Sequence, residues 1–253
     1  MIELQGRRAL VTGAAQGLGL AIARLFAQRG AQVMLADIDE AGAAKAADAI
    51  GPMARSVRCN VTSAADLRRA VEATTQAFGG MDTLINNAGI EIVKPLLDHS
   101  EDEYERLMAI NVKGVFLGMK EALGALVASG RGSIVNISSL AGTNGVPLFG
   151  CYAASKAAVL QLTRTAAAEL KPAGVRVNAV CPGFVGTAMV ERLIPTVEAA
   201  VGVPFDALVA AKQGRLGTPQ EVAEMVAFLA SDAASWTTGS HYILDGGLSA
   251  GLL

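Results

Sequence analysis

Tyr152 and Lys156 have the residue types and the spacing of a proton-transfer pair. Residues four apart lie on one face of a helix, so the phenol and the ammonium would point into the same space. A free tyrosine, with a pKa of about 10, is a poor base at neutral pH, whereas a neighbouring cation favours the phenolate. A Tyr-x-x-x-Lys pair also occurs by chance on helix surfaces, so this chemistry needs further groups beside the pair.

Ser139 is the first candidate for such a group. It lies thirteen residues before Tyr152 and follows an apolar run, Ser133–Ile137, that is predicted to be a strand. A hydroxyl at the end of that strand could donate a hydrogen bond to a carbonyl oxygen on which negative charge develops. Two serines after a strand are also typical of a plain turn.

A glycine-rich turn follows the first predicted strand and opens a helix. Its sequence is Thr12-Gly13-Ala14-Ala15-Gln16-Gly17-Leu18-Gly19, with the spacing G-x-x-x-G-x-G. Glycines let the backbone turn sharply and approach a pyrophosphate, and a helix N-terminus adds free N–H groups and a partial positive charge. Tight turns alone would also explain three glycines, but their place between a strand and a helix favours phosphate binding.

Asp37 ends the second predicted strand, eighteen residues beyond Gly19. A carboxylate there can accept hydrogen bonds from both adenosine ribose hydroxyls and would repel a 2′-phosphate. Ile38 follows it and Gln16 precedes Gly17, so neither place offers a cation to such a phosphate. The sequence therefore predicts NAD as the cofactor, whereas Asp39 is predicted to be a solvated turn residue.

These candidates need elements that bring them together. Short apolar runs alternate with helical patterns along the chain. The predicted strands are Arg8–Thr12, Gln32–Ala36, Arg55–Cys59, Asp82–Ile85, Ser133–Ile137, Val175–Val180 and His241–Leu244. The predicted helices are Gly19–Arg29, Glu40–Ile50, Ala64–Phe78, Glu101–Ala128, Tyr152–Leu170 and Gln220–Leu229.

This alternation predicts an α/β fold of the Rossmann type, a doubly wound parallel sheet with helices on both faces. Such sheets bind ligands at the carboxyl ends of their strands, where Ser139, Asp37 and the glycine turn lie. No linker interrupts the series, so we expect residues 1–253 to form one domain. Residues 182–218 are the least regular part, and we interpret them as a substrate-binding loop or lid within it.

Composition excludes several classes of function. Hydrophobic residues make up 52% of the chain and charged residues 17%, with a net charge of −2, which argues against disorder and against a nucleic-acid partner. The three cysteines lack C-x-x-C spacing, so we expect no disulfide framework and no metal site. Without a signal-peptide pattern or a run of about 20 apolar residues, the protein is expected to be cytoplasmic, with no membrane partner.

The ordered set of motifs resembles the short-chain dehydrogenase/reductase family, in its branch of chains of about this length. The set comprises the glycine turn, Asn86-Asn87-Ala88-Gly89, Asn111, Ser139, Tyr152 with Lys156, Pro182-Gly183 and the closing Asp245-Gly246-Gly247. The similarity covers essentially the whole chain. Each motif is modest alone, whereas their order is highly specific.

The resemblance implies a role for each matching residue. Tyr152 would exchange a proton with the carbonyl oxygen, Ser139 would polarise that carbonyl, Lys156 would hold the nicotinamide ribose and lower the tyrosine pKa, and Asn111 would anchor a water leading from Lys156. The implied cofactor-binding set is Gly13, Gln16, Gly17, Leu18, Gly19, Asp37, Asn60, Val61, Asn87, Ala88, Gly89, Tyr152, Lys156, Pro182, Gly183, Val185 and Thr187. Much of the family has an aspartate where Asn60 stands, and an amide can still pair with the adenine amino group.

The candidate substrate contacts are mostly apolar. They are Ala141, Asn144, Val146, Leu148, Phe149, Phe184, Met189, Leu193 and Ile194, with Glu91 and Asn144 as polar members. We therefore expect a neutral, fairly hydrophobic secondary alcohol and its ketone, although the same side chains could simply pack a lid or a subunit contact. The resemblance also implies a homotetramer built on the helices predicted at 101–128 and 152–170.

Two alternatives remain open from the sequence. One is an NADPH-dependent reductase of 3-oxoacyl or sugar substrates, against which Asp37 and Ile38 argue. The other is a dinucleotide-binding regulatory protein without catalysis, which would be expected to lack part of the set that is complete here.

Overall fold

The computed structural model describes residues 2–250. In that part of the chain, seven parallel strands form one sheet in the order β3-β2-β1-β4-β5-β6-β7. The strands are β1 (Arg8–Thr12), β2 (Gln32–Asp37), β3 (Ala54–Arg58), β4 (Thr83–Asn86), β5 (Ser133–Ile137), β6 (Arg176–Pro182) and β7 (His241–Leu244). The order reverses direction between β1 and β4, so the carboxyl ends of these two strands flank the topological switch point, where such sheets bind ligands.

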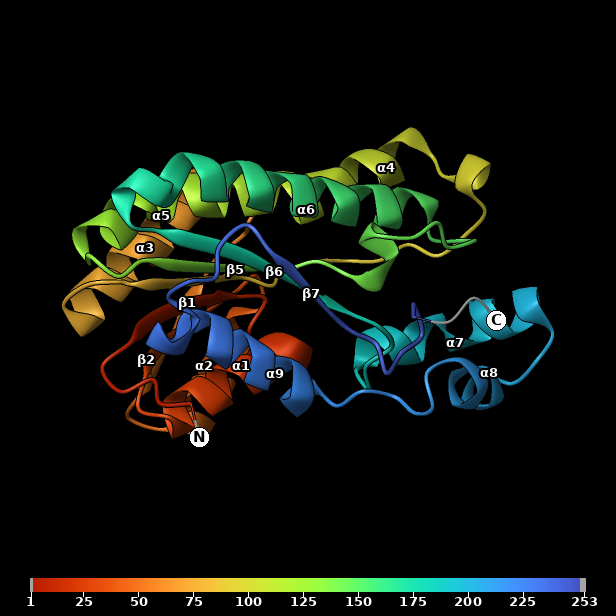
Figure 1. Cartoon of the computed structure of the whole chain (residues 1–253), viewed down its shortest axis with the longest axis horizontal. Coiled ribbons are helices and arrows are strands. Elements are labelled where there is room, and N and C mark those ends of the chain that lie inside the picture. The colour runs from red at the N-terminus through yellow and green to blue at the C-terminus, as the bar shows by residue number, and fades with distance from the viewer. Residues whose placement is uncertain (1, 251–253) are drawn as a thin grey trace.

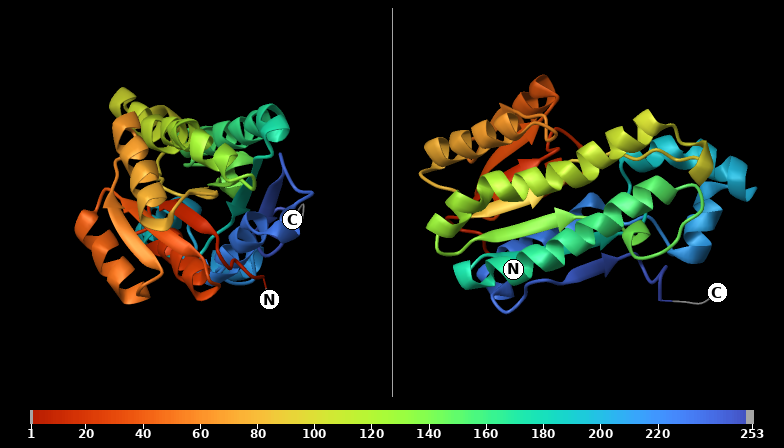
Figure 2. Two further views of the ribbon diagram at one scale, coloured as in Figure 1. Left: turned by 90° about the vertical axis from the view of Figure 1, so that its left-hand side faces the viewer. Right: turned by 90° about the horizontal axis from the view of Figure 1, so that it is seen from above.

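Helices cover both faces of the sheet (Figure 1). They are α1 (Gly17–Gln28), α2 (Glu40–Ile50), α3 (Ala64–Phe78), α4 (Glu101–Met108), α5 (Gly114–Ala128), α6 (Gly150–Leu170), α7 (Ala188–Val201), α8 (Phe205–Lys212) and α9 (Pro219–Ala230). Short 3-10 turns occupy Leu96–Asp98, Leu140–Gly142, Lys171–Ala173 and Asp232–Ala234. One layer contains α1, α2 and α9, and the other contains α3, α5 and α6, as the end-on view in Figure 2 also shows.

The two layers give two apolar cores, one on each side of the sheet. Phe26, Val33 and Val226 belong to the first core, and Leu67, Leu84 and Leu126 to the second. Every residue of β4 and β5 is buried, as expected for strands covered on both faces. The predicted single-domain Rossmann-type fold and its seven strands are therefore confirmed, with strand boundaries that differ by at most two residues.

Two predictions about helices were wrong. The helix expected over Glu101–Ala128 is interrupted by a π-helical turn, Ala109–Lys113, that separates α4 from α5. The segment 182–218 is not irregular, because it contains α7 and α8, which lie beyond the carboxyl ends of the strands (Figure 1). Gly202 ends α7 with a φ of 72°, and Pro204 precedes the first residue of α8.

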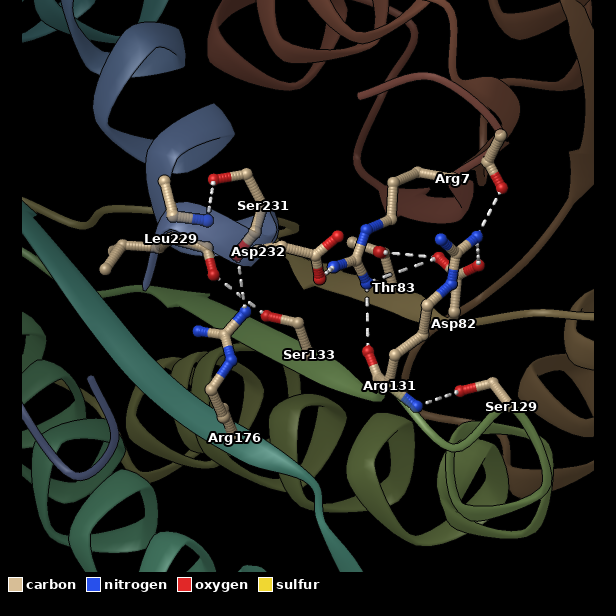
Figure 3. A network of polar contacts seen from close by, with 12 residues as sticks. Arg7, Asp82, Thr83, Ser129, Arg131, Ser133, Arg176, Leu229, Ser231 and Asp232 are labelled. Atoms are coloured by element: carbon tan, nitrogen blue, oxygen red, sulfur yellow. Dashed lines mark hydrogen bonds and ion pairs between the residues drawn. The ribbon is translucent and has the colours of Figure 1, made fainter. Parts of the chain in front are cut away.

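The amino-terminal edge of the sheet carries a network of charged side chains (Figure 3). Asp82, fully buried before β4, accepts hydrogen bonds from the backbone N–H of Arg8 at 3.0 Å, from Thr83 Oγ1 at 3.0 Å and from Arg131 Nη2 at 3.0 Å. Arg7, also buried, donates to the Arg131 carbonyl at 2.9 Å and pairs with Asp232. These contacts join the starts of β1, β4 and β5 to the turn after α9.

Candidate functional site

The glycine turn packs against the turn that follows β4. Gly13 has a φ of 64°, and a Cβ there would lie 2.8 Å from the Cα of Ala88. A Cβ on Gly19 would lie 2.2 Å from the Gly13 carbonyl oxygen. Since real Cβ atoms do not approach backbone so closely, no other residue fits without moving one of the two turns. Gly17, with a φ of 57°, begins α1, two residues before the predicted start.

Asn87 holds these two turns together. Its Nδ2 donates to the carbonyls of Thr12 at 2.9 Å and of Gly13 at 3.0 Å, so the amide nitrogen is engaged by the protein itself. Thr12 Oγ1 in turn accepts the backbone N–H groups of Asn87 at 3.0 Å and Ala88 at 3.1 Å. The sequence analysis did not single out Thr12, although a threonine that ends a buried strand just before a glycine is the signal that could have drawn attention to it.

Asp37 is fixed at the end of β2. Its Oδ2 accepts the backbone N–H of Ala15 at 2.9 Å, and its Oδ1 accepts that of Asp39 at 3.0 Å. Asp39, expected to be a solvated turn residue, is exposed and in addition caps α2 by accepting the N–H of Gly42 at 3.0 Å. Ile38 is largely exposed beside Asp37, so this rim of the site is apolar where a 2′-phosphate would need a cation.

A long cavity of about 390 Å³ runs along the carboxyl ends of the strands from Asp37 to Tyr152. Most of the predicted cofactor-binding residues line it: Gly13, Gln16, Leu18, Asp37, Asn60, Val61, Asn87, Ala88, Gly89, Tyr152, Lys156, Pro182 and Thr187. Four do not. Gly17 and Gly19 shape the turn beneath it, Gly183 lines a neighbouring cavity, and Val185 packs in the apolar core and pairs with Gly217.

Asn60 and Thr187 are partly engaged at the two ends of the cavity. Asn60 Oδ1 accepts the N–H and the hydroxyl of Thr62, at 3.0 and 2.9 Å, which leaves its amide nitrogen free to donate. Thr187 Oγ1 accepts the N–H of Val190 at 3.4 Å and thereby caps α7. The first turn of α7 is therefore tied to the rim of the cavity.

Tyr152, Ser139 and Lys156 meet where the strands β5 and β6 end. Tyr152 is the third residue of α6, and Lys156 lies one turn later on the same face, with its Nζ 5.6 Å from the centre of the tyrosine ring. The ammonium donates to the Ile137 carbonyl at 3.0 Å. Ser139 Oγ accepts the N–H of Ala141 at 3.2 Å and keeps its proton for another partner.

Burial dominates the acid–base properties of this group. It raises the pKa of Tyr152 to about 12, against the lowering effect of a hydrogen bond with Ser139 and with a further increase from the Glu91 carboxylate. The same desolvation lowers the pKa of Lys156 to about 8. The sequence analysis expected the neighbouring cation to lower the tyrosine pKa; in the structure the loss of water around the phenol is the larger effect.

Asn111 lies behind this group, in the π-helical turn. Its Oδ1 accepts the N–H of Ile90 at 2.9 Å, and its Nδ2 donates to the Ile90 carbonyl at 2.9 Å and to Ser155 Oγ at 3.0 Å. The amide therefore clamps the segment after β4 to α6. The inserted residue of a π turn re-aims a side chain, and such turns are frequent at functional sites. Asn111 is fully buried and does not line the cavity.

A second, smaller cavity of about 130 Å³ adjoins the first. Of the predicted substrate contacts, Ala141, Val146, Phe149, Phe184, Met189, Leu193 and Glu91 line it. Asn144, Leu148 and Ile194 do not; Leu148 instead adopts a φ of 71° and accepts a hydrogen bond from Lys94 N at 3.0 Å. Leu140, Pro182, Gly183, Val190 and Leu248 complete the wall and were not predicted as substrate contacts.

Gln213 was also missed. This buried side chain follows α8 and accepts the N–H of Phe184 at 2.8 Å, while its Nε2 donates to the carbonyls of Phe184 at 2.7 Å and Arg215 at 2.8 Å. Phe184 then packs edge-on against Phe205 with ring centres 5.2 Å apart. Gln213 therefore fixes one wall of the smaller cavity. The partners are 29 residues apart, and nothing in the local sequence pattern links them.

Among residues 2–250, no group of three or more His, Cys, Asp or Glu side chains is gathered as a metal ion would require. In the same part of the chain, no single helix is long and apolar enough to cross a membrane; the pair of α7 and α8, bent by 87°, reaches that length and composition only together.

Comparisons with known proteins cover nearly the whole chain. A family model described as enoyl-(acyl carrier protein) reductase matches residues 13–249. The chain is 41% identical to 3-alpha-(or 20-beta)-hydroxysteroid dehydrogenase of Mycobacterium bovis, over 99% of this chain and 92% of the relative. It is 38% identical to 3-oxoacyl-(acyl-carrier-protein) reductase of Vibrio cholerae, over 98% of this chain and 99% of the relative.

A solved structure is also similar to this chain over nearly its whole length. The crystal structure of a short-chain type dehydrogenase/reductase from Mycobacterium marinum matches with a TM-score of 0.90 and 36% identity, and the match covers 99% of this chain and 98% of the other. The protein is thus an oxidoreductase of a family that binds a nicotinamide dinucleotide and acts on small molecules. The resemblance inferred from the ordered motifs is confirmed, and the chain belongs to the short-chain dehydrogenase/reductase family.

Proposed function

We propose that the protein is an NAD-dependent oxidoreductase that interconverts a neutral, fairly hydrophobic secondary alcohol and its ketone. One observation carries the proposal: Tyr152 and Ser139 line both cavities, the long one at the strand ends and the small apolar one. A carbonyl carbon between them would face a nicotinamide ring on one side, while the rest of the substrate occupied the apolar cavity.

Tyr152 is the proton donor in reduction and the proton acceptor in oxidation. With a pKa of about 12, the phenol is protonated at neutral pH and ready to donate to a carbonyl oxygen. Ser139 donates a second hydrogen bond to that oxygen as negative charge develops on it. In oxidation, Lys156 supplies positive charge next to the phenol. Asn111 holds the segment after β4 through Ile90, and in the proposed mechanism it would anchor a water between Lys156 and solvent.

The long cavity fits NAD. The glycine turn offers a cradle that a Cβ would fill, and the N-terminus of α1 opens onto it. Asp37 accepts the ribose hydroxyls, Asn60 and Val61 meet the adenine, and Asn87, Ala88 and Gly89 line the adenosine side. Pro182 and Thr187 hold the nicotinamide end together with Lys156, while Gly183 and Val185 support that wall from outside the cavity. When bound, the nicotinamide gives or takes the hydride.

The segment 182–218 is the substrate lid of the proposed enzyme. Met189, Val190 and Leu193 on α7 and Phe184 before it close the apolar cavity, so a substrate has to pass this segment. We further propose a cytoplasmic homotetramer assembled on α4–α5 and α6. Tyr104 and Phe116 are about half exposed on α4 and α5, which supports a contact between subunits there.

An NADPH-dependent reductase of 3-oxoacyl substrates is the second candidate. The matching family model and the relative from Vibrio cholerae favour it. Asp37 argues against it, because its carboxylate would repel a 2′-phosphate and the next residue, Ile38, which also lines the cavity, carries no charge. A non-catalytic regulatory role is the third and weakest candidate, since the catalytic set is complete.

The first experiment follows the absorbance of reduced nicotinamide with neutral secondary alcohols and ketones, with NAD(H) and NADP(H) side by side. We expect turnover of apolar substrates with NAD(H). Tyr152→Phe should lower kcat by at least about 10³-fold, because it removes the proton donor and keeps the shape of the ring. Unchanged NADH binding by that variant is the control.

Preference for NADP(H) would contradict the role of Asp37. Turnover that survived Tyr152→Phe would contradict the proton-transfer mechanism. Tight NAD binding without turnover of any alcohol or ketone would favour the regulatory candidate.

A further inference from the structure

Glu91 is a carboxylate in a small cavity whose other lining residues, apart from the reacting Ser139 and Tyr152, are apolar. Among residues 2–250, the small cavity is lined by the side chains of Leu140, Val146, Phe149, Phe184, Met189 and Leu193, and Glu91 is its only acidic member. The Glu91 side chain is 9% exposed. Burial of a carboxylate raises its pKa, and Arg192 opposes that shift. A charged group in this cavity is unfavourable unless a partner compensates it, because burying a charge costs free energy.

The backbone beside Glu91 is held firmly. Asn111 binds both the N–H and the carbonyl of Ile90, each at 2.9 Å, so the residue before Glu91 is fixed to the π-helical turn. The carboxylate is close enough to Tyr152 to raise the pKa of its phenol. Glu91 is therefore presented at a constant position near the reacting group.

Arg192 uses only part of the hydrogen-bonding capacity of the Glu91 carboxylate. Its Nη2 lies 3.3 Å from Glu91 Oε1, longer than a typical ion-pair hydrogen bond, and its own side chain is 60% exposed on α7. A carboxylate can accept about four hydrogen bonds. Glu91 thus has acceptor capacity left toward the apolar cavity, while its countercharge lies on the solvent side.

We propose that Glu91 is a specificity-determining residue: its carboxylate accepts a hydrogen bond from a hydroxyl group of the substrate remote from the reacting carbon, and it excludes anionic substrates. This inference rests on the proposed function and narrows its substrate to a neutral compound with a second hydroxyl. A hydroxyl group of a bound substrate can donate a hydrogen bond to the buried Glu91 carboxylate. A methyl group at the same place makes no such bond, and an anionic group is repelled by the carboxylate.

Three cyclohexanones of one shape provide the test: 4-hydroxycyclohexanone, 4-methylcyclohexanone and 4-oxocyclohexanecarboxylate. In the wild-type protein with NADH we expect the hydroxy compound to have the highest kcat/KM. Glu91→Met should reduce the ratio of the hydroxy to the methyl compound about tenfold or more, the loss expected for one charge-assisted hydrogen bond. It should also raise kcat/KM for the carboxylate about tenfold, because Arg192 is then free to attract it.

Arg192→Met is the matched control, because it breaks the same ion pair and keeps Glu91. We expect it to preserve the hydroxy-to-methyl ratio within about threefold and still to reject the carboxylate. If Arg192→Met changed the ratio as much as Glu91→Met, the pair would only brace α7 and the inference would be overturned. An unchanged ratio in Glu91→Met would overturn it as well.

A binding measurement separates this inference from the proposed function. Calorimetric titration of the NADH-saturated protein with 1,4-cyclohexanediol and 4-methylcyclohexanol requires no turnover. A preference for the diol that is lost in Glu91→Met supports Glu91 even if no ketone is reduced, in which case the proposed function alone fails. Turnover without such a preference overturns the inference alone.

Discussion

Buried charge is well compensated at the amino-terminal edge of the sheet and poorly compensated at the carboxyl-terminal edge. At the amino-terminal edge, Asp82 accepts hydrogen bonds from Arg8, Thr83 and Arg131, so a buried carboxylate is surrounded by donors. Figure 3 shows Thr83 and Arg131 beside it. At the carboxyl-terminal edge, Lys156 has a single hydrogen bond, to the Ile137 carbonyl, and its pKa is lowered to about 8. The first arrangement stabilises the fold, and the second keeps reactive groups poorly compensated, as functional sites commonly do.

The largest effect on stability is therefore expected at Asp82. Asp82→Asn leaves Arg8 and Arg131 without their shared countercharge and should lower the free energy of unfolding by about 3 kcal/mol or more. Urea unfolding measures this, and kcat/KM of the folded variant should remain at the wild-type value. Asp232→Asn, at a carboxylate that is 80% exposed, is the control and should cost about 1 kcal/mol or less. Equal losses for the two variants would mean that burial of Asp82 carries no special weight.

Removal of the buried charge at the other edge should have the opposite sign. Lys156→Met deletes a cation whose burial is poorly compensated. It should raise the free energy of unfolding at pH 7 by about 2 kcal/mol, which is the penalty implied by the lowered lysine pKa minus the contribution of the lost hydrogen bond to the Ile137 carbonyl. The sign follows because burial lowers the pKa of Lys156 in the folded state to about 8, below the ordinary lysine value of 10.5. Below pH 8 the lysine is protonated in both the folded and the unfolded state, so the full cost of burying its charge applies. Between pH 8 and 10.5 the folded state loses the proton while the unfolded state keeps it, so this cost decreases to zero.

The pH series is what makes this prediction specific. The advantage of Lys156→Met should shrink as pH rises from 8 and vanish near 10.5, while its catalytic activity is lost at every pH. Lys120→Met, at an exposed lysine of α5, should change stability by less than about 0.5 kcal/mol throughout. A destabilised Lys156→Met variant would show that the lysine is a structural residue, and the contrast between the edges would fail.

The sequence predicted one edge much better than the other. Ser139, Tyr152 and Asp37 each follow from a strand end or a helical spacing, so local patterns were enough to bring them to one edge. Asp82 and Arg7 gave no such signal, because their charged partners lie 49 to 225 residues away and depend on the packed sheet.

The same limit applies within the site. The ion pair of Glu91 with Arg192 joins positions 101 residues apart, and the Gln213 clamp on Phe184 joins positions 29 apart. Neither has a periodicity that a sequence can display. The π-helical turn at Asn111 was missed for a related reason: the segments of α4 and α5 each look helical, and the turn between them is a pattern of backbone hydrogen bonds that the residue types of Ala109–Lys113 do not display. The direction of the Tyr152 pKa shift also depends on burial, which the Tyr-x-x-x-Lys spacing does not encode.

The smallest expected effect concerns Asp37, which belongs to the carboxyl-terminal edge and yet is well compensated. Its two oxygens accept backbone N–H groups of Ala15 and Asp39, so its charge is held as firmly as that of Asp82 while still facing the cavity. Asp37→Ser should raise the ratio of kcat/KM with NADPH to that with NADH about tenfold, because it removes both repulsion of a 2′-phosphate and an acceptor for the ribose.

Asp37→Asn separates these two contributions, since an amide still accepts a hydrogen bond but carries no charge. If repulsion is the main effect, this variant should gain activity with NADPH while its KM for NADH changes by less than about threefold. If Asp37→Asn instead loses NADH affinity as strongly as Asp37→Ser and gains nothing with NADPH, hydrogen bonding alone sets the preference. The Asp37 carboxylate at the carboxyl-terminal edge would then act like Asp82 at the amino-terminal edge: it would accept hydrogen bonds and would not exclude an anion.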